Sequence, residues 1–278
     1  AGLRQRLGIF DRPLLMSIFK PCLGLSAQAL GEMFFQQAAG GVDLVKDDEI
    51  LVDESLDTAL ARLEACLKAA QRAGGTVLYA VNLTGPAAEL LSRAQALVRS
   101  GATCLLFNFL AYGVSTMQML AEADLGVPIM AHPALSGAFF PAADHGIASH
   151  VLLGKIARLA GADLVLFPSP YGTVAMRREN ALKIALVLTA PLHHHAASFP
   201  VPSAGITPGL VPKILQDFGP EVVVNAGGGI HGHPGGAQAG ARAFRQAIEA
   251  TLRGVPLADA AQKQEELRAA LALWGPRP

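Results

Sequence analysis

The chain has 278 residues, of which 51% are hydrophobic and 16% are charged. This composition excludes an intrinsically disordered chain, and the length is close to the roughly 250 residues of a single α/β barrel. Lysine and arginine together number 22, as do aspartate and glutamate, so the formal net charge is zero and lacks the basic excess of a nucleic-acid-binding protein.

Cysteine usage and apolar runs indicate the compartment. The three cysteines, Cys22, Cys66 and Cys104, are too few and too far apart for a disulfide framework or a zinc ribbon. No apolar run approaches the roughly 18 to 20 residues needed to cross a bilayer, and the first residues lack the apolar core of a signal peptide. We therefore expect a cytoplasmic protein without a membrane or nucleic-acid partner.

Eight short apolar runs, each closed by glycine, proline or a polar turn, are predicted to be strands. They do not alternate between apolar and polar residues, which is typical of parallel strands buried on both faces. In chain order they cover residues 14–19, 44–46, 77–82, 104–108, 128–132, 164–167, 199–203 and 222–225. Helical stretches are predicted between or after them at residues 27–39, 55–73, 87–100, 147–160, 179–188, 210–217 and 236–252.

This alternation predicts a closed, parallel (β/α)8 barrel, the TIM barrel. Repeated Ala-Gly elements at residues 38–41, 73–75, 100–102 and 160–162 each end a helix before a strand, as αβ turns at the barrel floor do. An open doubly wound sheet is the alternative, but no G-x-G-x-x-G turn follows an early strand. We expect a linker over residues 1–13, the barrel over 14–255, and a helical tail over 256–278 whose extra amphipathic helix packs outside the barrel or on a partner.

The densest group of polar residues follows the second strand, where a barrel places reactive groups. Strand side chains alternate, so Lys46 and Asp48 should point into the barrel mouth, and Glu49 can join them from the loop. Two carboxylates suit Mg²⁺. A buried neutral lysine can react with CO2 to give a carbamate, which would be a third oxygen ligand. The alternative is a solvated cluster with an internal ion pair.

Glycine-rich loops follow the last two strands, where phosphate sites lie in barrels. One loop contains Ser203 and Gly205, and the other contains Gly227 and Gly228. Either loop alone is also compatible with a plain tight turn. Together they predict a phosphorylated substrate.

Two further residues at strand ends have alternative roles. His132 can bond a substrate oxygen or transfer a proton, or it is a core histidine. Lys20 can stabilise a developing enolate or act as a base, or it forms a structural ion pair with the neighbouring loop.

Three strings, in this order, closely resemble the large-subunit barrel of RuBisCO and RuBisCO-like proteins: FKPCLGLS at residues 19–26, GVDLVKDDE at 41–49 and NAGGGIHGHP at 225–234. Residues 78–85, 128–133 and 167–172 look most like the RuBisCO-like 2,3-diketo-5-methylthiopentyl-1-phosphate enolases of methionine salvage. The resemblance implies that Lys46 is carbamylated and binds Mg²⁺ with Asp48 and Glu49. It also implies that Ser203, Gly205, Gly227 and Gly228 contact phosphate, and that Lys20 and His132 lie near the substrate as catalytic residues together with Lys46.

Departures from RuBisCO itself argue against CO2 fixation. Cys22 replaces the second lysine of the K-P-K motif, Pro133 replaces an arginine, and the loop-six glycine-lysine is missing from residues 171–175. We therefore expect an Mg²⁺-dependent enolase. The alternatives are a RuBisCO-like isomerase or decarboxylase of another sugar phosphate, or a non-catalytic sugar-phosphate-binding barrel. The resemblance further implies a homodimer and an α/β domain before the barrel, and we expect this chain to lack that domain.

Overall fold

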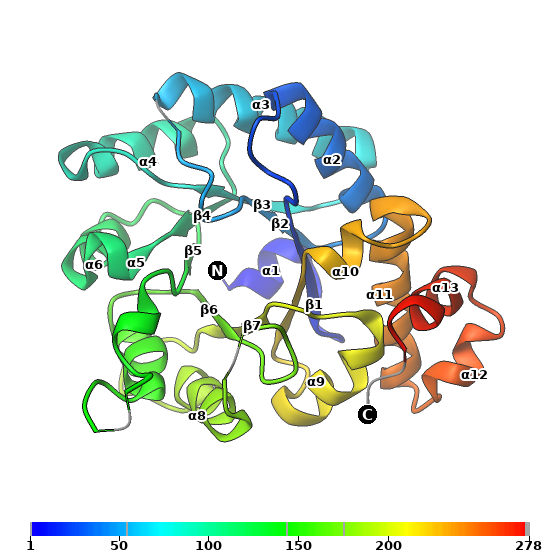
Figure 1. Cartoon of the computed structure of the whole chain (residues 1–278). Helices are drawn as coiled ribbons and strands as arrows, with labels where there is room; N and C mark the ends of the chain where they lie inside the picture. The colour runs from blue at the N-terminus through cyan, green and yellow to red at the C-terminus, as the bar shows by residue number, and fades with distance from the viewer. Residues whose placement is uncertain (1, 54, 143, 175, 276–278) are drawn as a thin grey trace.

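The computed structural model describes residues 2–53, 55–142, 144–174 and 176–275. Eight parallel strands form one sheet in the order β7-β6-β5-β4-β3-β2-β1-β8. Their bounds are β1 (Leu14–Ile18), β2 (Leu44–Lys46), β3 (Leu78–Asn82), β4 (Cys104–Phe107), β5 (Ile129–Ala131), β6 (Leu164–Pro168), β7 (Phe199–Ser203) and β8 (Val223–Ala226). The two ends of this order, β7 and β8, lie side by side, so the sheet curls into the expected (β/α)8 barrel (Figure 1).

Helices surround the barrel, and they come from the stretches between the strands. The longer ones are α2 (Ala27–Ala39), α3 (Leu56–Ala73), α4 (Leu90–Arg99), α6 (Val114–Glu122), α8 (Arg178–Thr189), α9 (Val211–Phe218) and α11 (Gly236–Leu252). Between β5 and β6 the helix is a π-helix (His150–Ile156) followed by α7 (Ala157–Leu159). The shorter ones are α5 (Phe109–Tyr112), α10 (Gly228–His231) and the 3-10 turns η1 (Ala87–Glu89), η2 (Ser136–Ala138) and η4 (Pro208–Leu210).

All eight predicted strands are present, and their ends differ from the predictions by no more than one residue. The predicted turns between helices and strands are present too. Gly74 and Gly161 each follow a helix, and their φ values of 76° and 95° lie in a region that favours glycine. The helices predicted from the sequence do not include α6, which buries only Met117 and Leu120 and so has a weak apolar stripe.

The chain ends differ in detail from the expectation. Residues 1–13, expected to be linker, include the helix α1 (Leu3–Leu7). Its Leu3 and Leu7 are buried against the apolar interior of the barrel. The expected single tail helix is instead two helices, α12 (Leu257–Ala261) and α13 (Glu265–Trp274), of which α13 packs on α11.

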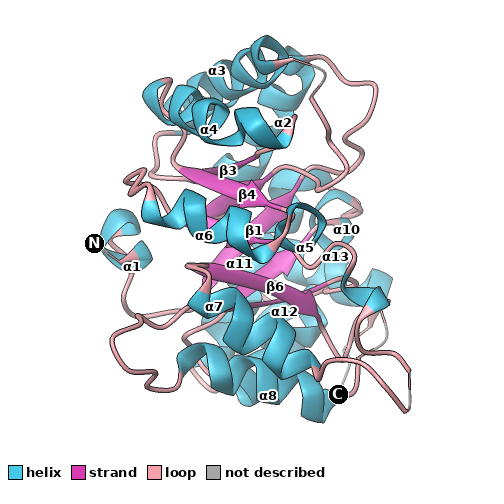
Figure 2. Cartoon of the chain, turned by 90° about the vertical axis from the view of Figure 1, so that its left-hand side faces the viewer, coloured by secondary structure: helices cyan, strands magenta, loops and turns pink. Residues whose placement is uncertain are grey.

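The barrel interior changes from apolar to polar along the strands. Apolar side chains such as Leu44, Ala80, Met130, Val201 and Val223 fill its lower part. Two positions further along each strand, on the same face, the residues are Lys46, Asn82, His132, Ser203 and Asn225. Figure 2 shows α1 at one end of the barrel and α10 at the other, so this polar layer lies at the mouth, away from α1.

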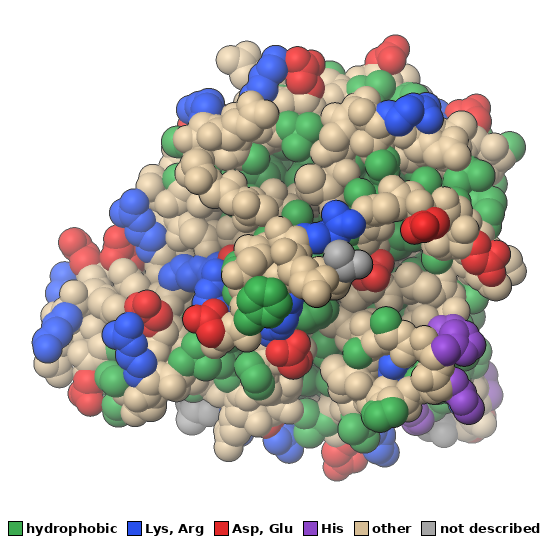
Figure 3. Space-filling model, turned by 180° about the vertical axis from the view of Figure 1, so that it is seen from behind, with side chains coloured by type: hydrophobic (Ala, Val, Ile, Leu, Met, Phe, Trp, Pro, Cys, Tyr) green, Lys and Arg blue, Asp and Glu red, His purple; other side chains and the backbone are tan. Residues whose placement is uncertain are grey.

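The face opposite the mouth carries interspersed acidic and basic side chains, with histidines gathered at one side (Figure 3). Among the described residues, no helix combines the length and the apolar character that a membrane span requires.

Candidate active site

A cavity of about 440 Å³ opens at the carboxyl ends of the strands. The predicted site residues that line it are Lys20, Lys46, Glu49, His132, Ser203, Gly205, Gly227 and Gly228. They come from both halves of the chain, and the closure of the barrel brings them together. Asp48 is fully buried beside the cavity and reaches it through Lys20, with which it forms an ion pair.

Lys46 is the last residue of β2 and is only 1% exposed. Its Nζ donates to the carbonyl of Asp47 at 2.8 Å and lies 3.2 Å from Glu49 Oε2. Complete burial lowers the pKa of Lys46, although the carboxylates of Glu49 and Asp48 favour the charged form. The amine is therefore nearer to its neutral, nucleophilic form than a lysine in water.

Asp48 lies between Lys20 and the loop backbone. Its Oδ2 accepts from Lys20 Nζ, and its Oδ1 accepts from the N–H of Ile50 at 3.1 Å. Burial lowers the pKa of Lys20, but the hydrogen bond and charge of Asp48 outweigh this effect and raise it. Lys20 is thus protonated in this arrangement, which suits it to stabilise negative charge and not to remove a proton.

These groups meet the chemical requirement of a magnesium site only if Lys46 is modified. Among the residues that the structure describes, no group of three His, Cys, Asp or Glu side chains could hold a metal ion. Asp48 and Glu49 supply two carboxylates, and an ammonium cannot ligate a cation. A carbamate on Lys46 would add the third anionic oxygen donor, so the donor set fits Mg²⁺ in that form.

His132 is held in one tautomer. Its Nδ1 accepts from the N–H of Ala134 at 3.1 Å, so the ring proton lies on Nε2, which is 3.3 Å from Glu49 Oε2. Burial and the Lys46 ammonium lower the pKa of His132 to about 3, so the ring is neutral at physiological pH. In this arrangement the ring of His132 lies beside the Glu49 carboxylate without bringing a positive charge to it.

The two glycine loops face the same cavity from β7 and β8. Asn225 Nδ2 donates to Ser203 Oγ at 2.9 Å, so a side-chain bond links these strands at the mouth. A Cβ on Gly227 would lie 2.5 Å from Ile18 Cγ2, whereas one on Gly228 would meet no protein atom within 4 Å. The backbone of Gly227 packs on β1, and that of Gly228 borders open space where an anion can approach its N–H.

Other polar side chains at the strand ends form hydrogen bonds with backbone groups. Asn82 and Asn108 donate to carbonyls of the loop after β2, Thr84 accepts from the N–H of Asp53, and Ser169 accepts from that of Tyr171. His231 bonds the carbonyl of Ile18, and His233 accepts from the N–H of Gly235.

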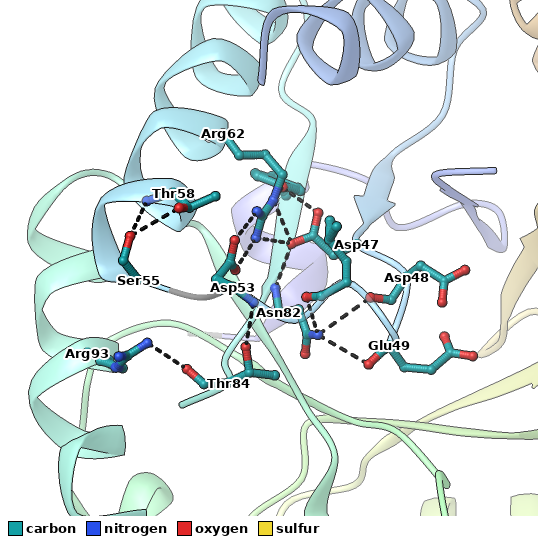
Figure 4. Close-up of polar contacts among 12 residues, drawn as sticks. Asp47, Asp48, Glu49, Asp53, Ser55, Thr58, Arg62, Asn82, Thr84 and Arg93 are labelled. Carbon is teal, nitrogen blue, oxygen red and sulfur yellow. Dashed lines mark hydrogen bonds and ion pairs between the residues drawn. The ribbon is translucent and has the colours of Figure 1, made fainter. Parts of the chain in front are cut away.

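A buried network that contains Arg62, Asp53 and Tyr79 was not predicted from the sequence. Figure 4 shows the Arg62 guanidinium directed toward Asp47 and Asp53. A signal was present, because Arg62 lies in the buried stripe of α3 formed by Ala59, Leu63, Cys66 and Ala69. A charged residue within an apolar stripe requires a buried partner.

Comparison with known proteins identifies the family. Residues 1–274 match the family described as ribulose bisphosphate carboxylase large chain, catalytic domain. The chain belongs to this family. The match covers every strand of the barrel and each residue of the candidate site.

Relatives within the ribulose bisphosphate carboxylase large-chain family include proteins named as enolases. A 2,3-diketo-5-methylthiopentyl-1-phosphate enolase from Geobacillus thermodenitrificans is 52% identical over 280 residues, covering 99% of this chain and 68% of the relative. One from Bacillus mycoides is 52% identical over 279 residues, covering 99% and 67%. The chain thus spans about two thirds of the length of these relatives.

Solved structures of the family share the barrel. The rubisco-like protein MtnW from Alicyclobacillus acidocaldarius is 51% identical with a TM-score of 0.91, covering 98% of this chain and 69% of that protein. The octameric ribulose-1,5-bisphosphate carboxylase/oxygenase from Pyrococcus horikoshii is 34% identical with a TM-score of 0.93, covering 98% and 66%. The expected fold class and family are therefore confirmed.

Proposed function

We propose that this chain is the barrel of an Mg²⁺-dependent enolase that tautomerises 2,3-diketo-5-methylthiopentyl 1-phosphate in methionine salvage. The observation that carries the proposal is the fully buried Lys46 amine, which lies 3.2 Å from Glu49 Oε2 and lines the same cavity as two glycine loops. The enolase name of relatives at 52% identity supports the choice of substrate.

The charges of the site support a carbamate on Lys46. With Lys20 and Lys46 protonated and Asp48 and Glu49 ionised, the four groups sum to zero. CO2 adds to the neutral amine, so the Lys46 ammonium first gives up one proton to solvent, and formation of the carbamate releases a second. Lys46 thus changes from +1 to −1, the four groups then sum to −2, and one Mg²⁺ restores neutrality. Because a buried site tolerates little net charge, carbamylation of Lys46 should strengthen Mg²⁺ binding, and bound Mg²⁺ should stabilise the carbamate.

Each residue then has a role in enolisation, which moves a proton from a carbon next to a carbonyl to that carbonyl oxygen. Bound to Lys46, Asp48 and Glu49, Mg²⁺ would act as a Lewis acid toward the substrate oxygens. Lys20, released from Asp48, would stabilise negative charge that develops on the substrate. His132, whose Nε2 lies 3.3 Å from Glu49 Oε2, would border the same site with a neutral ring.

The glycine loops would hold the phosphate. Gly205, Gly227 and Gly228 line the cavity and carry no side chain that would keep an anion away from their backbone N–H groups. Ser203, at the end of β7, lines the same cavity and accepts from Asn225 of β8. The phosphate would anchor one end of the substrate, so that its carbonyls lie toward β2.

Exchange of the substrate proton with D2O tests the proposal. In the presence of Mg²⁺ and bicarbonate, the protein should catalyse the incorporation of deuterium into the substrate, at the carbon next to the reacting carbonyl. Omission of either component should abolish the incorporation. Failure to exchange while inorganic phosphate still binds would instead indicate a sugar-phosphate-binding barrel without turnover.

We also propose a homodimer in the cytoplasm. A family member from Hyperthermus butylicus, with a TM-score of 0.90 and 32% identity, is described as dimeric. The cysteines Cys22, Cys66 and Cys104 are all free and buried, in agreement with a reducing compartment. Sedimentation of the purified chain would test the dimer.

A further inference from the structure

A buried arginine joins the two ends of the loop that carries Asp48 and Glu49. Arg62, on α3, donates from Nη1 and Nη2 to both carboxylate oxygens of Asp53 at 2.6 and 2.7 Å. It also donates from Nε and Nη2 to Asp47 Oδ2 at 3.2 and 3.0 Å. Asp47 precedes the two expected metal ligands and Asp53 follows them, so one guanidinium links both sides of the loop (Figure 4).

The network is sealed from water and closely bonded. The side chains of Arg62, Asp47 and Asp53 are 3%, 0% and 3% exposed. Tyr79 donates its hydroxyl to Asp47 Oδ1 at 2.5 Å, and the N–H of Asn82 donates to Asp47 Oδ2 at 2.8 Å. A planar guanidinium with several short bonds permits little change in the separation of its two carboxylates.

The middle of the same loop is held from the strands. Asn82 Nδ2 donates to the carbonyls of Glu49 and Leu51 at 3.3 and 3.0 Å, and Asn108 Nδ2 donates to that of Glu49 at 3.2 Å. None of these contacts uses the side-chain oxygens of Asp48 or Glu49. The network therefore fixes the backbone while it leaves both carboxylates directed toward Lys20, Lys46 and the cavity.

We infer that Arg62 is a positioning residue for the metal-binding loop, setting where Asp48 and Glu49 lie relative to Lys46 and hence the affinity for a divalent cation. The inference rests on the proposed function, because it assigns the loop to metal binding. Stability alone does not require such a network, since well-packed apolar side chains replace buried ion pairs without loss in many proteins.

The variant Arg62→Lys keeps the positive charge but cannot bond both carboxylates bidentately. We expect it to weaken Mn²⁺ binding in bicarbonate by about 10- to 100-fold, as loss of a contact that supports metal ligands does. Electron paramagnetic resonance of Mn²⁺ measures this affinity without turnover. Hydrogen exchange of the Ile50 and Leu51 amides should become faster in the same variant.

Arg158→Lys is the matched control. Arg158 is also 3% exposed, but the hydrogen bonds of its guanidinium go to backbone carbonyls of residues 187, 190, 195 and 196, in the last turn of α8 and the segment after it. This variant should lower the melting temperature without changing Mn²⁺ affinity. Tyr79→Phe removes one bond to Asp47 and keeps the ring, so it should weaken Mn²⁺ binding a few-fold even if Arg62→Lys does not fold.

The outcomes separate this inference from the proposed function. Normal Mn²⁺ affinity and unchanged Ile50 and Leu51 exchange in folded Arg62→Lys or Tyr79→Phe would overturn the positioning role. Equal loss of Mn²⁺ affinity in Arg158→Lys would overturn it as well. Wild-type protein that binds Mn²⁺ but does not exchange its substrate proton with D2O would contradict the enolase function and leave the role of Arg62 supported by the variants.

Discussion

The Nζ atom of Lys46 lies 3.2 Å from Oε2 of Glu49, in a pair whose lysine is only 1% exposed and whose glutamate is 25% exposed. Lys46 ends β2, Glu49 belongs to the loop that follows, and both line the cavity at the barrel mouth. The most buried cation of the site therefore contacts a carboxylate that the cavity can reach.

Replacing Lys46 removes the amine that would carry the carbamate. Lys46→Met should abolish the bicarbonate dependence of Mg²⁺ binding and lower proton exchange at least about 100-fold, because one oxygen ligand can no longer form. Calorimetric titration with Mg²⁺, with and without bicarbonate, measures the first effect. Lys155→Met, at an exposed lysine of the π-helix, is the control and should behave as wild type. A bicarbonate effect that persists in Lys46→Met would contradict the carbamate.

Without bicarbonate and Mg²⁺, when Lys46 is an unmodified amine, His132 should remain neutral over the physiological range. Because burial and Lys46 lower its pKa to about 3, below the ordinary value of 6.5, the folded protein should not take up a proton on this ring between pH 8 and pH 5. The unfolded chain does take it up, so this group stabilises the fold above pH 6.5 and loses that contribution as the pH falls toward 3. NMR of the ring carbon proton should show a constant shift, with the proton on Nε2. Titration near pH 6.5 would refute the arrangement.

The two neighbouring glycines of the loop after β8 should respond differently to alanine. Gly228→Ala places a methyl group where no protein atom lies within 4 Å, so stability should be unchanged. The affinity for inorganic phosphate should fall about tenfold, equivalent to one lost hydrogen bond to a charged group. Gly227→Ala meets Ile18 Cγ2 at 2.5 Å and should instead lower the free energy of unfolding by about 1–3 kcal/mol. Urea unfolding and phosphate titration distinguish the two, and equal behaviour in both assays would argue against a phosphate site at Gly228.

Protonation of Asp43 at low pH should lower the free energy of unfolding of the barrel. Burial raises the pKa of this carboxyl, but bonds from Arg12, Arg245 and the N–H of Leu15 outweigh it and hold the pKa below 3.8. The lowered value means that the contribution to stability is complete above about pH 4 and is lost as the pH falls through the folded-state pKa. Asp43→Asn should lower the free energy of unfolding at pH 7 by about 1–3 kcal/mol, because two partly buried arginines lose their anion. It should also flatten the fall in stability between pH 4 and pH 2 in urea unfolding, and an unchanged pH profile would exclude Asp43 as its source.

Much of the fold followed from the sequence because strand and helix periodicities are local. Apolar runs closed by glycine or proline located every strand, and the period of two placed Lys46 on the inner face of β2. Periodicity did not predict the weakly amphipathic α6 or the division of the tail into α12 and α13, because few residues of these helices are buried.

By itself the sequence determined the order of strands and helices, the family, and which polar residues lie at the mouth. Only the tertiary structure decided how those residues pair: that Glu49 contacts His132, that Asp48 contacts Lys20, and that Arg62 is the partner of Asp47 and Asp53. The physical reason is that periodicity depends on neighbours along one segment. The partner of a buried charge depends on where the closed barrel places other segments, and on the need to satisfy every charge that it removes from water.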